Sequence, residues 1–248
     1  MNPIKYLLAV GLAEATAAIR HRSVSLCGTR TLMYHDLGDG SPSRDIYVLS
    51  PSLFRAQMET VTEWVASQQL HFVSLGSDPQ PGIAITFDDG YRSTLSVAAP
   101  LLVRLGIPFH VFVTRSYCLS GNFRYLTESD LRELASLPNV VIGAHGATHA
   151  PLAQMSADDL QRELSESRDW LQQILQRPVE SMSYPHGSFT PAVADAAHKH
   201  GYHYACSSKV GTYHSASQRL IIPRIDIWSR DSARTTLRKL QGSWDWML

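Results

Sequence analysis

The 248-residue sequence has few cysteines, no excess of one charge and no long apolar run. Its three cysteines, Cys27, Cys118 and Cys206, are too few and too widely spaced for a disulfide framework or a Cys-x-x-Cys metal site, so we expect a reducing compartment. Lysine and arginine together number 22, as do aspartate and glutamate, which excludes the basic field of a typical nucleic-acid-binding protein. We therefore predict no nucleic-acid partner.

The first apolar run, Tyr6 to Ala13, is short, and Glu14 interrupts it before it could span a membrane. We expect residues 1–28 to form an N-terminal helix or leader, followed by one domain at residues 29–248 that acts as a monomer. Two locations remain open. One is cytoplasmic, with the N-terminal helix touching a membrane surface. The other is export, because the small residues Ala15, Thr16 and Ala17 resemble a signal-peptide cleavage site.

From residue 29 onward, short β-branched or aromatic runs alternate with segments of helical period, which predicts an α/β fold with a parallel sheet. Helix starts are expected at Ser50-Pro51, at Thr127 with Asp130, at Ser156 with Asp159, and at Thr190-Pro191. No repeat or linker divides the chain, so one closed or nearly closed barrel is favoured. The seven expected strands are Thr31 to Tyr34, Ile83 to Phe87, Phe109 to Val113, Val140 to Ala144, Ser181 to Tyr184, His203 to Ser207, and Ile221 to Ile227.

Two adjacent carboxylates, Asp88 and Asp89, follow the apolar strand at Ile83 to Phe87, and Gly90 comes next. The carboxyl ends of barrel strands face the active site, so one carboxylate can bind a cation while the other addresses water or substrate. Asp-Asp-Gly is also a common turn sequence, because glycine readily adopts a positive φ. This motif alone therefore indicates a site and a turn about equally.

A histidine pair, His145 and His149, follows the strand at Val140 to Ala144. On a helical turn a spacing of four residues places both imidazoles on one side, as a shared divalent metal requires. With 11 histidines in the chain such a pair can arise by chance, but both motifs start at strand ends that converge. Two histidines and one carboxylate are typical of a catalytic zinc site with open positions.

Two further histidines follow strands: His35 after the first, and His186 in the SYPHG stretch. A lone histidine in such a place is more often a loop filler than a functional group. The rigid turn at Pro185 could instead direct the backbone N–H of His186 inward as an oxyanion donor.

The motifs TFDDG, HGATH and SYPHG, in this order, resemble those of the polysaccharide deacetylases with NodB homology, carbohydrate esterase family 4. The resemblance covers most of the chain after residue 30 and implies a deformed (β/α)7 barrel. It implies that Asp88 is the general base and that Asp89, His145 and His149 bind the metal. Gly143 and the Thr148 side chain would then support these ligands.

The third motif departs from the family pattern, which usually opens with arginine and ends with an aromatic residue. Here Ser183 and His186 occupy those positions, and Arg224 is our candidate to replace the arginine that orients the base. The late Leu-x-His motif, which usually supplies the acid, is also missing, since His214 has no such leucine. One branch of the family, which includes poly-N-acetylglucosamine deacetylases, resembles this chain in an early YH motif, and this implies that His35 is the acid.

These features together predict a metal-dependent hydrolase that removes N-acetyl groups from the N-acetylhexosamine residues of a polysaccharide or lipid-linked saccharide. Zinc is the expected metal, and cobalt, nickel or iron would also suit the ligands. One alternative is a glycan-binding barrel without activity, with tryptophans stacking on sugars, although Trp64 and Trp170 have the spacing of helix packing residues. Another is a metal amidase for a different acylated sugar or a peptide, because the loops at Leu37 to Tyr47 and Thr114 to Arg124 carry no readable specificity.

Overall fold

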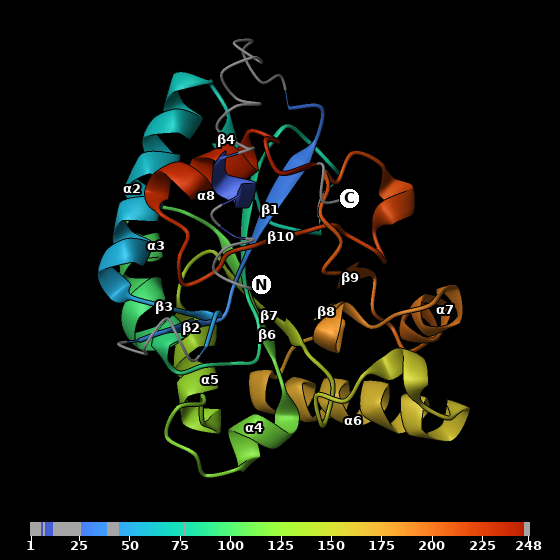
Figure 1. Ribbon diagram of the computed structural model, residues 1–248. Coiled ribbons are helices and arrows are strands. Elements are labelled where there is room, and N and C mark those ends of the chain that lie inside the picture. The colour runs from blue at the N-terminus through green and yellow to red at the C-terminus, as the bar shows by residue number, and fades with distance from the viewer. Residues whose placement is uncertain (1–5, 7, 12–25, 39–44, 77, 246–248) are drawn as a thin grey trace.

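The computed structural model describes residue 6 and residues 8–11, 26–38, 45–76 and 78–245, and its centre is one curved parallel sheet (Figure 1). The strand order is β10-β1-β5-β6-β7-β8-β9, and β4 also pairs with β5. A separate pair, β2 and β3, lies beside it. The strands are β1 (Thr29–Tyr34), β2 (Asp36–Leu37), β3 (Val48–Leu49), β4 (His71–Phe72), β5 (Gly82–Phe87), β6 (Phe109–Val113), β7 (Val140–Ala144), β8 (Ser181–Ser183), β9 (Tyr204–Cys206) and β10 (Ile225–Asp226).

The helices cover the outside of the sheet, and each of the four expected helix starts carries its N-cap hydrogen bond. Thr127 and Asp130 form the full reciprocal capping box, whereas Asp159 accepts a hydrogen bond from the Ser156 hydroxyl. The helices are α2 (Pro51–Ser67), α3 (Ala99–Arg104), α4 (Arg115–Leu119), α5 (Glu128–Ser136), α6 (Ala157–Leu175), α7 (Pro191–Lys199) and α8 (Ala233–Leu240). Single turns are η1 (Thr94–Ala98), η2 (Leu152–Gln154), η3 (Pro185–Gly187) and η4 (Ala216–Gln218).

The last expected strand, Ile221 to Ile227, shows how the sheet curls towards closure. Ile222 forms a parallel β-bridge with Cys206, the last residue of β9. Three residues later, β10 pairs in parallel with β1. One short segment therefore connects the two ends of the sheet. This arrangement confirms the expected α/β fold of NodB type, with a curled parallel sheet surrounded by helices.

Burial on both faces explains why the central strands are continuous apolar runs. All six residues of β5 are buried, as are all five of β6. Trp64 on α2 is buried against this core and Trp170 on α6 is half-buried against it, as their spacing predicted. The hydrophobic contacts fix the strand ends, and the side chains that follow the strands are thereby held in place.

Most of the expected N-terminal helix or leader, residues 1–28, lies outside the described residues. Tyr6 and residues 8–11 are helical, and the Tyr6 hydroxyl donates to the Arg230 carbonyl at 2.8 Å and to Asp231 Oδ1 at 2.9 Å. The Tyr6 ring also packs against both Trp228 and Trp244, which contact each other. This short helix therefore packs on the barrel next to α8 (Figure 1). Among the residues that the structure describes, no helix has the length and apolarity needed to cross a membrane.

Candidate active site

The chain turns sharply where β5 ends, and this turn separates Asp88 from Asp89. Asp89 has φ +71° and Gly90 has φ +81°, both in the left-handed region. Aspartate tolerates this conformation better than most residues, and strain of this kind concentrates at functional sites. Asp-Asp-Gly is thus a turn and at the same time places two carboxylates in different surroundings.

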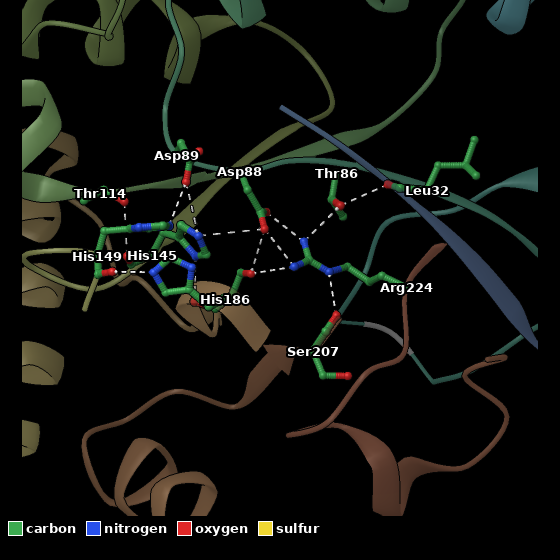
Figure 2. Close-up of polar contacts among 11 residues, drawn as sticks. Leu32, Thr86, Asp88, Asp89, Thr114, His145, His149, His186, Ser207 and Arg224 are labelled. Carbon is green, nitrogen blue, oxygen red and sulfur yellow. Dashed lines mark hydrogen bonds and ion pairs between the residues drawn. The ribbon is translucent and has the colours of Figure 1, made fainter. Parts of the chain in front are cut away.

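Asp88 lies in a buried network in which both of its oxygens are satisfied (Figure 2). Arg224 donates to Asp88 Oδ1 at 2.7 Å and to Oδ2 at 2.8 Å, and the Ser183 hydroxyl donates to Oδ2 at 3.0 Å. Arg224 is itself held by the Ser207 carbonyl, at 2.9 Å, and by Thr86 Oγ1, at 3.3 Å. This bidentate ion pair between Arg224 and Asp88 fixes the orientation of the carboxylate.

The charges of this network decide the ionisation of Asp88. Burial would raise the pKa of Asp88, but the charge of Arg224, together with that of His145, lowers it below its usual range. In turn, burial would lower the pKa of Arg224, and the neighbouring Asp88 carboxylate raises it. Asp88 is therefore a carboxylate at neutral pH and is available as a proton acceptor.

The second carboxylate, Asp89, faces the two predicted ligand histidines. Asp89 Oδ1 is 3.1 Å from His149 Nε2 and 3.4 Å from His145 Nε2, and the three ligand atoms lie within 4.8 Å of one another. The Ser183 carbonyl lies 2.8 Å from His145 Nδ1, so the ring N–H of His145 points there and Nε2 carries the lone pair. These three residues form a group that could hold a metal ion.

The surroundings of Asp89 Oδ1 suit a metal ion better than a hydrogen-bond donor of the protein. Its Oδ1 atom is buried and has no hydrogen-bond partner among the described residues. A buried polar atom of this kind normally signals a missing partner, and a cation between Asp89, His145 and His149 would satisfy it. The chemistry of the donor set, two imidazoles and one carboxylate, agrees with such a cation.

The histidine pair does not lie on a helical turn, so this part of the prediction was wrong. Gly146 and His149 both have positive φ, +76° and +67°, and these two reversals bring the rings together at 4.9 Å between centroids. The backbone loop, and not helical periodicity, therefore aligns the two imidazoles.

Glu163 on α6 supports this loop, and no motif in the sequence predicts its role. Its carboxylate accepts hydrogen bonds from the backbone N–H of Ala147 at 2.7 Å, from that of Thr148 at 3.0 Å, and from the Thr148 hydroxyl. Thr148 thus supports the ligand loop, as expected, through Glu163. Gly143 has a different role from the one expected, because a Cβ there would lie 2.6 Å from the Ser181 carbonyl and would block the close approach of β7 and β8.

A cavity of about 380 Å³ opens at this end of the barrel, and six of the seven predicted site residues line it. Arg224 is the exception, since it is fully buried behind Asp88. The predicted residues that line the cavity are His35, Asp88, Asp89, His145, His149 and His186.

His35 follows the end of β1 and lines the cavity, far from the three candidate metal ligands in the sequence. Its ring packs on Tyr47 at 4.4 Å between centroids, and its Nδ1 is buried without a hydrogen-bond partner among the described residues. Asp226 of β10 lines the same cavity, and its Oδ1 is equally without a partner in that part of the chain. Burial raises the pKa of Asp226, and the charge of His35 opposes this rise. Sequence reasoning missed Asp226, although it too stands at the end of a predicted strand.

His186 follows β8 in a strained turn, with φ +57°. Its imidazole Nε2 lies 3.1 Å from the His149 carbonyl, and its ring packs on that of His149. By contrast, the exposed His214 forms local bonds with Thr212 and Gln218 and is not among the residues lining the catalytic cavity.

Comparisons with known proteins agree with this geometry. The sequence matches the family profile described as polysaccharide deacetylase over residues 76–205, just over half of the chain. The chain is 26% identical over 187 residues to the protein YxkH of Bacillus subtilis. That alignment covers 73% of this chain and 64% of YxkH, so the chain spans less than two thirds of this relative.

Two solved structures show the same fold. The deacetylase PplD of Streptococcus pyogenes, solved in complex with acetate, has a TM-score of 0.72 at 22% identity. The alignment covers 87% of this chain and 99% of PplD. IcaB from Ammonifex degensii has a TM-score of 0.70 at 20% identity, with 86% of this chain and 97% of IcaB aligned. These two structures support the fold. The matching family profile confirms the resemblance carried by TFDDG, HGATH and SYPHG: the chain belongs to the polysaccharide deacetylase family.

Proposed function

We propose that this protein removes N-acetyl groups from the N-acetylhexosamine residues of a glycan, with a divalent metal and with Asp88 as the base. The observation that carries the proposal is the division of labour at the end of β5. Asp88 is ionised and oriented by Arg224, whereas Asp89 faces His145 and His149 with an unpartnered oxygen. One carboxylate is thus suited to proton transfer and the other to metal binding.

A divalent cation, most simply zinc, would be held by Asp89, His145 and His149 and would activate a water molecule and polarise the acetamide carbonyl. Asp88 accepts the proton of the attacking water. Asp88 Oδ2 lies 3.9 Å from His145 Nε2, so the base stands beside the ligand group without belonging to it. Arg224 is a positioning residue, because its guanidinium holds the Asp88 carboxylate in one orientation.

The negative charge that develops on the acetamide oxygen needs a hydrogen-bond donor, and the backbone N–H of His186 supplies it. Such a donor contributes roughly 3 kcal/mol to a reaction of this type. The leaving amine needs a proton, which His35 donates. Asp226 lines the cavity together with His35. Burial and the charge of His149 lower the pKa of His186, which makes its imidazole the weaker candidate for the acid.

The glycan is a polysaccharide or a lipid-linked saccharide, and the products are acetate and a free amine. We place the protein in the cytoplasm, with a peripheral membrane contact through its N-terminal residues, and as a monomer. Export remains the alternative location. A metal amidase for another acyl group is the alternative activity, because the same base and ligands cleave any amide that the cavity admits.

Acetate release tests the proposal directly. The purified protein, analysed for bound metal, is incubated with chitooligosaccharides, poly-N-acetylglucosamine and lipid-linked N-acetylhexosamines, and acetate is measured. We expect acetate from at least one of these glycans, loss of activity with a chelator, and recovery with zinc or cobalt. Activity that persists after the chelator has removed all bound metal would exclude the proposed metal chemistry. Release of formate or of amino acids from other amides, without acetate, would favour the alternative.

A further inference from the structure

The ring of Tyr47 packs on the ring of His35 in the catalytic cavity, which both residues line. The two ring centroids are 4.4 Å apart, and the ring planes are inclined by 41°. At this distance the rings are in contact, so neither can turn about its side-chain bonds without displacing the other. The orientation of the His35 imidazole therefore depends on Tyr47.

The pairing of β2 with β3 creates this contact. Asp36 pairs with Val48 in parallel register, and His35 and Tyr47 each precede their strand by one residue. Residues at matching positions of two parallel strands lie side by side, with their side chains on the same face. The register thus places the tyrosine ring beside the histidine that follows β1.

The backbone of Tyr47 is held independently of His35. The Tyr47 N–H donates to Asp45 Oδ1 at 2.9 Å, which is the hydrogen bond of an Asx turn. The carbonyl of Ile46 accepts from the Ser229 N–H at 2.7 Å, which ties the same segment to the chain that follows β10. Tyr47 can therefore serve as a fixed support for a neighbouring ring.

Hydrogen bonding does not hold His35 in the way it holds a ligand histidine. His35 Nδ1 and Asp226 Oδ1 are both buried, and neither has a hydrogen-bond partner in the described part of the chain. By contrast, His145 Nδ1 lies 2.8 Å from the Ser183 carbonyl, which fixes that ring. At His35 the contact with Tyr47 takes the place of such a bond.

The phenol of Tyr47 remains uncharged in this position. Burial and the negative charge of Asp226, followed by those of other nearby carboxylates, raise the pKa of Tyr47 to about 12. The phenol therefore keeps its proton near neutral pH, and its contact with His35 is the packing of a neutral ring. A phenylalanine ring has the same shape and should provide the same support.

We propose that Tyr47 is a positioning residue for the general acid, because its ring holds the His35 imidazole where it can protonate the departing amine. This inference rests on the proposed function, in which His35 is the acid. When the C–N bond breaks, the nitrogen keeps the electron pair and takes the proton from the imidazole, while the carbonyl group of acetate re-forms. A donor acts only within hydrogen-bond distance, so a displaced imidazole slows this step in particular.

The experiment compares two substrates that differ in their need for an acid. An N-acetylated chitooligosaccharide has an amine leaving group, which must be protonated. The ester 4-nitrophenyl acetate has a phenolate leaving group, which departs without a proton and still needs the metal and the base. Both are assayed with the wild type, Tyr47→Ala and Tyr47→Phe. Tyr204→Ala, at another half-buried tyrosine that does not line the cavity, is the control.

We expect kcat for the amide to fall at least about tenfold in Tyr47→Ala, with ester hydrolysis within about twofold of the wild type. Tyr47→Phe should restore most of the amide rate, and Tyr204→Ala should leave both rates unchanged. Equal losses on amide and ester would overturn the inference, since they indicate general damage to the site. An unchanged amide rate in Tyr47→Ala, or a loss in Tyr47→Phe as large as in Tyr47→Ala, would also overturn it.

A double-variant cycle shows whether Tyr47 acts through His35. His35→Ala alone should reduce the amide rate by about a hundredfold or more. Adding Tyr47→Ala to His35→Ala should then change the rate by less than about twofold, because the ring has no acid left to hold. Losses that multiply in the double variant would show that Tyr47 acts independently of His35, and would contradict the inference.

If the wild type releases no acetate from any glycan, the proposed function fails, and nuclear magnetic resonance decides the inference separately. The His35 ring signals are recorded in protein labelled with ¹³C-histidine and are assigned by their loss in His35→Gln. Removal of the tyrosine ring in Tyr47→Ala should shift and broaden these signals, whereas Tyr47→Phe should keep them sharp. Unchanged His35 signals in Tyr47→Ala would show that Tyr47 does not hold the imidazole.

Discussion

Asp88 and Asp89 are neighbours in the chain but belong to opposite kinds of buried site. Asp88 sits in a closed network, where Arg224 and Ser183 donate to its oxygens and the Ser207 carbonyl accepts from Arg224. Asp89 sits in an open one, where Oδ1 faces two imidazole nitrogens and no donor among the described residues. A closed network is complete without a ligand, whereas an open one requires a cation for its completion.

The two carboxylates therefore contribute to different properties of the protein. The Asp88 network contributes to the stability of the fold and to proton transfer. The Asp89 group contributes to metal binding and is held by a loop whose shape depends on Gly146 and Glu163. Variants of the two halves should therefore separate stability from metal affinity.

The largest effect is expected for Asp89→Asn. Asparagine also tolerates a positive φ, so the turn should persist, but the neutral amide is a much poorer ligand. We expect metal affinity to fall at least about a hundredfold and acetate release at least about a thousandfold. The melting temperature of the metal-free protein should stay within about 2 °C of that of the wild type. Metal titration and thermal unfolding check this, and a large drop in metal-free stability would show that Asp89 also stabilises the fold.

Arg224→Met is the matching change on the other side. It removes the partner of a fully buried carboxylate, so the free energy of unfolding should fall by about 3–5 kcal/mol. Acetate release should fall by about a hundredfold at a temperature where the variant is folded, because Asp88 loses its fixed orientation. Metal affinity should change little. Urea unfolding and metal titration measure both effects, and unchanged stability would show that the network is not closed in the way described.

Glu163→Gln tests how the ligand loop is held. The amide can no longer accept all three hydrogen bonds that the carboxylate receives from residues 147 and 148. We expect metal affinity to fall about 10- to 100-fold. Glu166→Gln, on the same helix but exposed and paired with Arg115, is the control and should leave metal affinity unchanged. Equal losses in both variants would assign the effect to helix α6 as a whole.

His110 offers the smallest effect and a contrast to the ligand histidines. It is buried in β6, its Nε2 accepts from the Leu75 N–H at 2.9 Å, and burial lowers its pKa from 6.5 to about 3. The unfolded chain therefore binds a proton below pH 6.5 that the folded protein does not, so stability decreases as pH falls. From pH 7 to pH 5 this loss is roughly 2 kcal/mol.

His110→Gln should remove that loss, since glutamine can still accept from Leu75 but does not titrate. Urea unfolding at pH 5, 6 and 7 gives the free energy of unfolding of both proteins. The other histidines contribute equally to both, so the difference between the two pH profiles reports His110. Parallel pH profiles for wild type and variant would show that His110 is not the buried neutral histidine described.

The fold and the site residues that directly follow strands could be predicted because they depend on local signals. Apolar runs locate the strands, capping residues locate the helices, and the strand-end rule brings Asp88, Asp89, His35 and His145 to one edge. Arg224 could be proposed only because the family resemblance showed that an arginine was missing elsewhere. Its contact with Asp88 depends on the curl that brings β10 beside β1.

Supporting contacts between distant elements could not be predicted in the same way. Glu163 lies in an ordinary helical sequence, and nothing in its own surroundings distinguishes it from Glu166 until α6 packs behind the ligand loop. The geometry of the histidine pair was also mispredicted, because spacing suggests a helical turn and only the backbone angles reveal the reversal at Gly146 and His149. Asp226 lies inside the expected strand Ile221 to Ile227, whereas the structure ends β10 at Asp226 itself, and this earlier strand end was not predicted.

The most direct test of the central claim, that Asp88 is the base and not a ligand, is acetate release by Asp88→Asn with its metal content measured. Asparagine is close in size to aspartate and can still accept from Arg224, but it cannot take a proton from water. We predict a full complement of metal together with a rate at least about a hundredfold below that of the wild type. Near-normal release of acetate by the metal-loaded variant would contradict the account.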